Sequence, residues 1–157
     1  MIYAEWNEKR TRHRLLYDDA MSPLDYEHFC ARRLESYGWK AEVTRASRDQ
    51  GADIVASSGG IRAVIQAKKY RSRVGNDAVQ QIYAAMRYYD AVPAAVVSTA
   101  DFTASARVLA RSTGVLLLHH DQLSNLQPQA RMGLAPESPP TLRPALWNQP
   151  NAERRKR

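Results

Sequence analysis

Asp53, Gln66 and Lys68 bring a carboxylate, an amide and an ammonium group into one short stretch of the sequence. Gly59-Gly60 stands between two strand-like runs and predicts a two-residue hairpin turn, which places Asp53 directly opposite Gln66. Lys68 lies two residues beyond Gln66, so it points to the same face and sits diagonal to Asp53, about 7–8 Å away. A longer turn would shift this register. In the predicted register, the three polar groups converge on one face of the hairpin.

Two interpretations of this trio are open. The first is a structural ion pair between Asp53 and Lys68, because structural pairs outnumber active sites. The second is a site for a hard divalent cation, because Gln66 and Lys68 interrupt an apolar run, where interior polar side chains usually have a partner or a task. Glu27 adds to the second interpretation, since it precedes Cys30 by one helical turn and is expected to face the sheet. Carboxylate and carbonyl oxygens are the ligands that such a cation prefers.

The elements that position these residues follow from caps and apolar periodicity. Ser22-Pro23 predicts the start of a helix that Gly38 ends. Strands are predicted at 39–45, 52–57 and 61–70, followed by a helix at 77–89, a strand at 94–99, a helix at 103–112 and a strand at 115–119. The last two strands are continuous apolar runs, typical of parallel strands covered on both faces. We therefore expect an α/β fold with a mixed sheet and helices on both sides.

Composition and charge exclude several classes of protein. The sequence has 157 residues, 44% hydrophobic and 25% charged, as in one globular domain and unlike a chain disordered throughout. Its single cysteine excludes an intramolecular disulfide scaffold and a zinc finger of CxxC type. The apolar runs fall short of the roughly 18 residues of a membrane helix, so we expect a cytoplasmic protein with no membrane partner. A net charge of +7 favours a polyanion such as nucleic acid.

The chain divides into three predicted parts. Residues 1–21 form an N-terminal extension that could include a short helix, and residues 22–127 form the folded domain. Residues 128–157 hold six of the eight prolines and show no periodicity, so we expect a mostly disordered tail. The tail carries six Lys or Arg against two Glu, more than half of the net charge. It is either a solubilising appendage or a non-specific tether to DNA.

A set of motifs follows in order along the predicted domain. They are Tyr26-Glu27, Asp49-Gln50-Gly51-Ala52-Asp53, Gln66-Ala67-Lys68-Lys69-Tyr70, Val79-Gln80-Gln81, residues 98–103, and Gly114-Val115-Leu116-Leu117 with Leu123. Through this ordered set, residues 23–126 resemble the catalytic domain of the Mrr-like restriction endonucleases, a branch of the PD-(D/E)xK nuclease superfamily. Gln66 agrees with this branch, which has Gln where most of the superfamily has Asp or Glu. The sequence departs from the family at Gln50 and Ala100-Asp101, where glycine is more frequent.

The resemblance implies a restriction-endonuclease-like α/β/α sandwich around a central mixed β-sheet. It also implies a metal-dependent endodeoxyribonuclease that hydrolyses DNA phosphodiester bonds. Asp53 would be the metal-binding acid, with the Ala67 carbonyl as a further ligand of Mg²⁺, or alternatively of Mn²⁺. Gln66 would be the second site residue and Lys68 the catalytic lysine. Because Gln66 is neutral, weaker metal affinity or recruitment of another acid is expected.

The resemblance extends to residues around this set. Glu27 would complete the site as the helix acid and metal ligand, and Gln80 or Gln81 would support it. The nearby basic side chains are either a solvated strand end or contacts to DNA phosphates, and beside a nuclease site we favour the contacts. These predicted phosphate-binding residues are Arg48, Lys69, Arg71 and Arg73.

Alternatives remain for the function and the partners. A non-catalytic DNA-binding or adaptor protein could retain the fold, and metal dependence would separate it from a nuclease. A structure-selective, junction-resolving nuclease is a further alternative, because fold does not fix function. Double-strand cleavage would favour a homodimer, since it needs paired active sites. The sequence shows no base-reading module, and it leaves open whether a separate subunit reads the DNA sequence.

His119 and His120, beside Asp121, resemble a metal-ligand cluster in residue type alone. We predict both histidines at the end of the last strand. Adjacent residues of a strand point to opposite faces, so they would not easily share one ion. We therefore expect a structural role for this pair of histidines.

Overall fold

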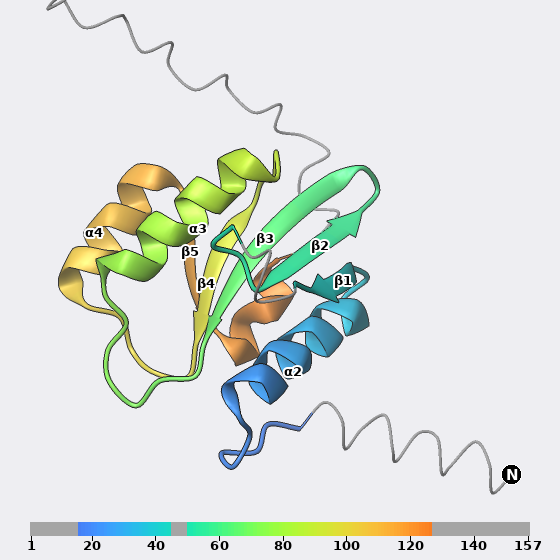
Figure 1. Cartoon of the computed structure of the whole chain (residues 1–157), viewed down its shortest axis with the longest axis horizontal. Coiled ribbons are helices and arrows are strands. Elements are labelled where there is room, and N and C mark those ends of the chain that lie inside the picture. Colours follow the sequence, from blue (N-terminus) through green and yellow to red (C-terminus); the bar gives the residue numbers. More distant parts are fainter. Residues whose placement is uncertain (1–15, 45–49, 127–157) are drawn as a thin grey trace, which may run out of the picture.

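The computed structural model describes residues 16–44 and 50–126, which form one mixed β-sheet with helices on both faces (Figure 1). The helices are α2 (Pro23–Ser36), α3 (Asn76–Tyr88), α4 (Ala104–Thr113) and the 3-10 helix η1 (His120–Asn125). The strands are β1 (Lys40–Val43), β2 (Ile54–Ser58), β3 (Ile61–Lys68), β4 (Ala94–Ser98) and β5 (Leu116–His119). The predicted α/β class and the predicted order of elements are confirmed, and η1 is an addition.

The sheet has the strand order β1-β2-β3-β4-β5, in which β1 to β3 pair antiparallel and β3 to β5 pair parallel. The β2–β3 turn is formed by Gly59 and Gly60, with φ values of 55° and 80° that favour glycine. Ser58 pairs with Ile61 and Ile54 with Ile65, which is the register predicted from the two glycines. The two apolar strands β4 and β5 are parallel, as predicted.

Two apolar cores cover the two faces of this sheet. Helix α2 buries one stripe, including Tyr26, Phe29 and Leu34, against one face, and η1 closes the same layer. Helices α3 and α4 pack on the other face, and Figure 1 shows them together, away from α2. All five residues of β4 are buried, because both of its faces are covered. Polar side chains buried between the sheet and its helices therefore need hydrogen-bond partners. Such side chains are informative about function.

Local signals set the start of α2. The Ser22 hydroxyl accepts a hydrogen bond from the Asp25 backbone N–H at 3.1 Å, and the Ser22 backbone N–H donates to the Asp25 carboxylate. This capping box, with Pro23 in the first turn, predicts the helix start that is observed. The cap places Glu27 in the second turn, half-buried.

The prediction that His119 and His120 point to opposite faces at the end of the last strand is wrong. His119 is the last residue of β5, but His120 is already the first residue of η1. The alternation of side chains therefore ends at His119, and the two imidazole rings lie together, with centroids 3.9 Å apart.

Some sequence predictions fall outside the part of the chain that the structure describes. They are the N-terminal extension up to residue 15, the residues from 127 onward that include the tail, and Arg48. Among the described helices, none has the length and apolar character needed to cross a membrane.

Candidate active site at the end of strand β3

Asp53 immediately precedes β2 and is bonded across the hairpin to β3. Its backbone N–H donates to the Ile65 carbonyl at 3.0 Å. Its side-chain Oδ2 accepts a hydrogen bond from the Ala67 backbone N–H at 2.8 Å. The carboxylate is therefore held beside the backbone between Gln66 and Lys68. This arrangement confirms that the hairpin brings these residues together, as the turn predicts.

The backbone of β3 also shows where the Ala67 carbonyl lies. The Lys68 carbonyl accepts from the Thr99 N–H on the β4 side, at 3.3 Å. Successive residues of a strand direct their backbone groups to opposite sides, so the groups of Ala67 lie on the β2 side. The hydrogen bond from the Ala67 N–H to Asp53 agrees with this direction. The Ala67 carbonyl and the Asp53 carboxylate thus lie on the same side of β3.

Gln66 is only 4% exposed and is oriented by helix α3. Its Nε2 donates a hydrogen bond of 2.7 Å to Oε1 of Gln81. This bond determines which way the amide faces, and it leaves Gln66 Oε1 buried with no hydrogen-bond partner among the described residues. A buried unsatisfied acceptor costs about 1–3 kcal/mol. Of the predicted pair Gln80 and Gln81, it is Gln81 that makes this bond.

Lys68 is the last residue of β3, and its backbone is held in place by β4. The Lys68 carbonyl accepts a hydrogen bond of 2.9 Å from the Ser98 hydroxyl. The next residue, Thr99, donates its hydroxyl to the Tyr70 carbonyl at 3.0 Å. The Lys68 side chain is half-buried, with Nζ 5.6 Å from the centre of the Tyr70 ring. The end of β3 is therefore fixed where the Lys68 side chain leaves the sheet.

Ser98 is a positioning residue that the sequence analysis quoted within a motif but gave no role. It is fully buried, and it donates to the Lys68 carbonyl while accepting from the Ala100 N–H at 2.9 Å. The signal was present, because Ser98 directly follows the apolar run 94–97. The same criterion, a polar residue within an apolar run, singled out Gln66.

Glu27 approaches the hairpin from α2, on the opposite face of the sheet from α3. Burial raises the pKa of the Cys30 thiol to about 12, and the nearby carboxylates of Glu27 and Asp53 both contribute to the rise. The two acids therefore lie within electrostatic range of one buried thiol. Gln66 is bonded to α3 instead. The two predicted acids therefore share the Cys30 thiol as a neighbour, Glu27 from α2 and Asp53 from the hairpin.

The predicted phosphate-binding residues differ in their surroundings. Lys69 Nζ donates to the Asp19 carbonyl at 2.7 Å and lies 3.9 Å from the Asp19 carboxylate, so this side chain is tied to the segment before α2. Arg71 and Arg73 follow β3 and are exposed. Arg71 and Arg73 are therefore more accessible to a phosphate backbone than Lys69.

Gly51 brings the loop before Asp53 against α3. Its φ is +85°, and a Cβ at this position would lie 2.7 Å from the backbone carbonyl oxygen of Gln81. A side chain would meet both backbone strain and a clash. The glycine thus permits the close approach of this loop to the residue that orients Gln66.

The end of the hairpin carries oxygen donors of three kinds. They are the Asp53 carboxylate, the Ala67 carbonyl and the Gln66 amide oxygen, and the Lys68 ammonium group lies on the same face as Gln66. Oxygen donors of this kind suit Mg²⁺ or another hard cation. The unpartnered Gln66 oxygen is the feature that an ion pair between Asp53 and Lys68 would not explain.

Comparison with known structures shows a fold shared with protein AF1548. Protein AF1548, of unknown function, has a TM-score of 0.55 and 20% identity over 62% of this chain and 58% of its own. The MspJI restriction endonuclease in complex with a 27-mer oligonucleotide has a TM-score of 0.46 and 20% identity, over 78% of this chain and 28% of its own. The chain thus spans less than two-thirds of either structure. Comparison with curated proteins returns no match.

Comparison with protein families identifies the chain. The model of one family, Mrr_cat, described as a restriction endonuclease, matches residues 18–127. This range includes the hairpin, α2 and α3, and therefore all the residues described above. It extends over more than half of the sequence, and it agrees with the resemblance seen in the motifs. The chain belongs to the Mrr_cat restriction endonuclease family.

Proposed function

We propose that this domain is a metal-dependent endodeoxyribonuclease that hydrolyses DNA phosphodiester bonds. The observation that carries the proposal is the Gln66 amide oxygen, which is buried and unpartnered among the described residues and belongs to the residue before Ala67, whose backbone N–H binds Asp53. A protein that uses this fold only to bind DNA has no need of such a group, which is costly to bury. A cation ligand is its simplest task.

The residues present fit a Mg²⁺ ion, with Mn²⁺ as an alternative. Asp53, the Ala67 carbonyl and Gln66 would hold it, and Glu27 is the acid available to add negative charge from α2. Bound there, the cation would neutralise charge that develops on the phosphate during hydrolysis. Because Gln66 is neutral, the site relies on the orientation of its amide for affinity, and Gln81 provides that orientation.

Lys68 would act on the phosphate itself. Its ammonium group can donate hydrogen bonds to a non-bridging phosphate oxygen or orient the attacking water. Ser98 and Thr99 hold the Lys68 carbonyl, so the side chain starts from a fixed point at the end of β3. Asp53 is likewise held by the Ala67 N–H. Both groups are positioned before substrate arrives, which lowers the cost of reaching the reactive geometry.

The proposal is tested by nicking of supercoiled plasmid with Mg²⁺, with Mn²⁺ or with EDTA, on methylated and unmethylated DNA. Conversion to open-circular or linear DNA in the presence of either cation, and its loss in EDTA, is the expected result. Salt-sensitive DNA binding without cleavage under any of these conditions would contradict the proposal and favour the adaptor alternative. Preference for branched over linear substrates would identify a junction-resolving nuclease.

Replacing Gln81 by alanine is expected to raise the Mg²⁺ concentration needed for half-maximal cleavage by about tenfold, the lower end of the effect of groups that orient metal ligands. Without its partner, the Gln66 amide can turn its nitrogen toward the cation. Cleavage at saturating Mg²⁺ should change much less. Gln80→Ala is the matched control, because Gln80 is the exposed neighbour on the same helix. Equal Mg²⁺ requirements of the two variants would show that Gln81 does not orient a ligand.

The Arg71→Ala, Arg73→Ala double variant is expected to weaken binding of non-cleaved DNA, measured in EDTA. If each arginine contacts one phosphate, the slope of log affinity against log salt should fall by about 2 in magnitude. Lys69→Ala should lower the magnitude of this slope less, because Lys69 already binds Asp19. Fluorescence anisotropy at several salt concentrations measures the slope. An unchanged slope in the double variant would place the phosphate contacts elsewhere.

A further inference from the structure

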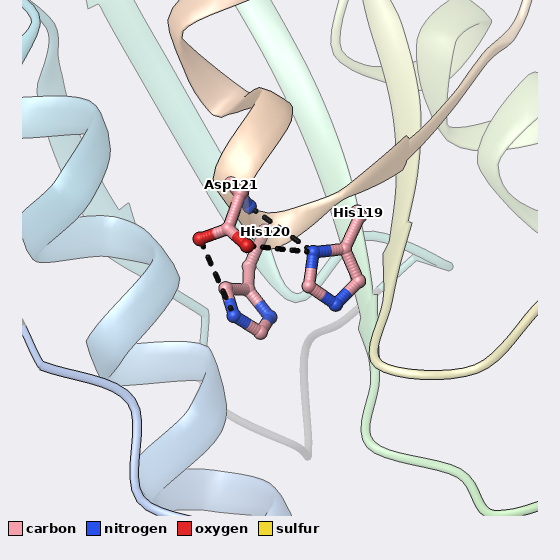
Figure 2. Close-up of side chains that lie close together, drawn as sticks. All are labelled: His119, His120 and Asp121. Atoms are coloured by element: carbon pink, nitrogen blue, oxygen red, sulfur yellow. Dashed lines mark hydrogen bonds and ion pairs between the residues drawn. The ribbon is translucent and has the colours of Figure 1, made fainter.

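His119, His120 and Asp121 gather at the junction of β5 and η1, away from the hairpin. Each residue offers one ligand atom, and these atoms all lie within 4.8 Å of one another. Figure 2 shows the Asp121 carboxylate beside the two rings, joined to a nitrogen of each by a dashed line. Its Oδ2 lies 3.2 Å from His119 Nδ1, and its Oδ1 lies 3.6 Å from His120 Nε2. One nitrogen of each imidazole ring thus faces the same carboxylate.

His120 is held by aromatic residues of the α2 layer. Its side chain is 6% exposed, and its ring stacks on Tyr17 with a centroid distance of 4.6 Å. The Phe29 ring packs edge-on at 5.4 Å. These contacts fix the ring plane so that Nε2 points toward Asp121. A ligand held in this way loses little conformational freedom when it binds an ion.

The other ring nitrogen of His120 has a hydrogen-bond partner in the Tyr26 hydroxyl. The Tyr26 hydroxyl is bonded to Cys30, and the Tyr26 oxygen lies 3.3 Å from His120 Nδ1. In the tautomer in which Nδ1–H donates to the Tyr26 oxygen, Nε2 has a lone pair for an ion. Metal-binding histidines have such a partner on the second nitrogen.

Local capping explains only part of this arrangement. His119 Nδ1 accepts from the Asp121 backbone N–H at 3.5 Å, which helps to start η1. Capping does not require the buried nitrogen of His120 to face the same carboxylate. Arg33 approaches that carboxylate from α2, with Nη2 4.0 Å from Oδ1. This distance is longer than a hydrogen bond, so Arg33 lowers the cation affinity of the cluster without occupying it.

We propose that His119, His120 and Asp121 form a second metal site, which takes a zinc-class divalent cation through two imidazole nitrogens and one carboxylate oxygen. This donor set suits Zn²⁺, whereas the oxygen donors around Asp53 suit Mg²⁺. His119 and Asp121 have side chains that are 42% and 68% exposed, so they can close around the ion. The fourth position faces solvent and can hold a water or an anionic oxygen. The proposal is independent of the nuclease activity.

Zinc binding is measured by calorimetry on the full chain after metal is stripped with EDTA and the chelator is removed. An Asp53→Asn background removes the other candidate cation site. We expect one equivalent of Zn²⁺ to bind in this background, and His119→Ala to weaken binding by more than about tenfold. His28→Ala is the matched control, because His28 is exposed on α2, and it should bind as the parent does. Absence of stoichiometric Zn²⁺ binding, or equal losses in both histidine variants, would overturn the proposal.

A second measurement separates an ordered site from weak surface binding. Zn²⁺ should raise the unfolding temperature of the parent, and this rise should vanish in Asp121→Asn, whose exposed side chain can change without disturbing the core. Tyr26→Phe keeps the packed ring but loses the oxygen that orients His120, so it should weaken Zn²⁺ binding by about tenfold. If Asp121→Asn keeps the full stabilisation by Zn²⁺, the ion binds elsewhere and the proposal fails.

Discussion

Lys68→Ala is expected to lower Mg²⁺-dependent nicking of supercoiled plasmid by about 10²–10³-fold or more, the loss typical of one group that stabilises transition-state charge. The variant should still fold and bind DNA, because Lys68 is half-buried and its backbone bonds to Ser98 and Thr99 do not involve the side chain. Asp53→Asn should cause a comparable loss, because it removes the one anionic ligand that the hairpin itself supplies.

Metal binding should distinguish the role of Lys68 from that of Asp53. Lys68→Ala should bind Mn²⁺ as the parent does, whereas Asp53→Asn should not, and titration of the Mn²⁺ electron paramagnetic resonance signal measures both. Lys40→Ala is the control for lost positive charge, since Lys40 is exposed on the edge strand β1. If either Lys68→Ala or Asp53→Asn retains metal-dependent cleavage, the assignment of the site is wrong.

Gly51→Ala is expected to lower the free energy of unfolding by about 2–5 kcal/mol, through a left-handed backbone conformation and overpacking together. The φ of Gly51 is +85°, and the new methyl group would lie 2.7 Å from the Gln81 carbonyl oxygen. The Gln81 carbonyl oxygen belongs to the backbone of α3, so it cannot move aside unless the helix moves. We therefore expect the loop to shift, carrying Asp53 with it, so that cleavage falls as well. Urea denaturation measures the first effect and plasmid nicking the second.

Gly60→Ala provides the matched control for Gly51. Gly60 has a φ of +80°, but a Cβ there would meet nothing within 4 Å. Gly60→Ala introduces the backbone strain without the clash. It should lower the free energy of unfolding by about 1–2 kcal/mol. It also lies at the far end of the hairpin from Asp53, so activity should survive. An equal loss of unfolding free energy in the two variants would mean that the packing of the loop against α3 does not stabilise the fold.

Much of the fold follows from patterns between near neighbours in the chain. Gly59-Gly60 determines the turn, and the turn determines that Ile54 pairs with Ile65, because side chains alternate along a strand. Ser22 and Pro23 determine where α2 begins. Hairpin register and helix start are therefore readable from the sequence. The placement of Asp53 beside β3 comes directly from that register.

The same reasoning failed where an element ends. Two adjacent histidines at a strand end were predicted to face opposite ways, but the strand stops between them. Boundaries depend on the packing of the next element, here η1 against α2, and a local pattern does not contain that information. The candidate zinc site was therefore invisible to an argument from alternation alone.

The sequence by itself determined the supply of chemical groups, the hairpin that brings Asp53 beside β3, and the family, because these depend on residue type and short spacings. Only the tertiary structure decided which glutamine of α3 reaches Gln66 and which way its amide oxygen faces. It also decided that Ser98 holds the end of β3. These contacts join residues 15 and 30 positions apart on different elements. They exist only because the burial of both apolar faces of the sheet sets where α3 and β4 lie.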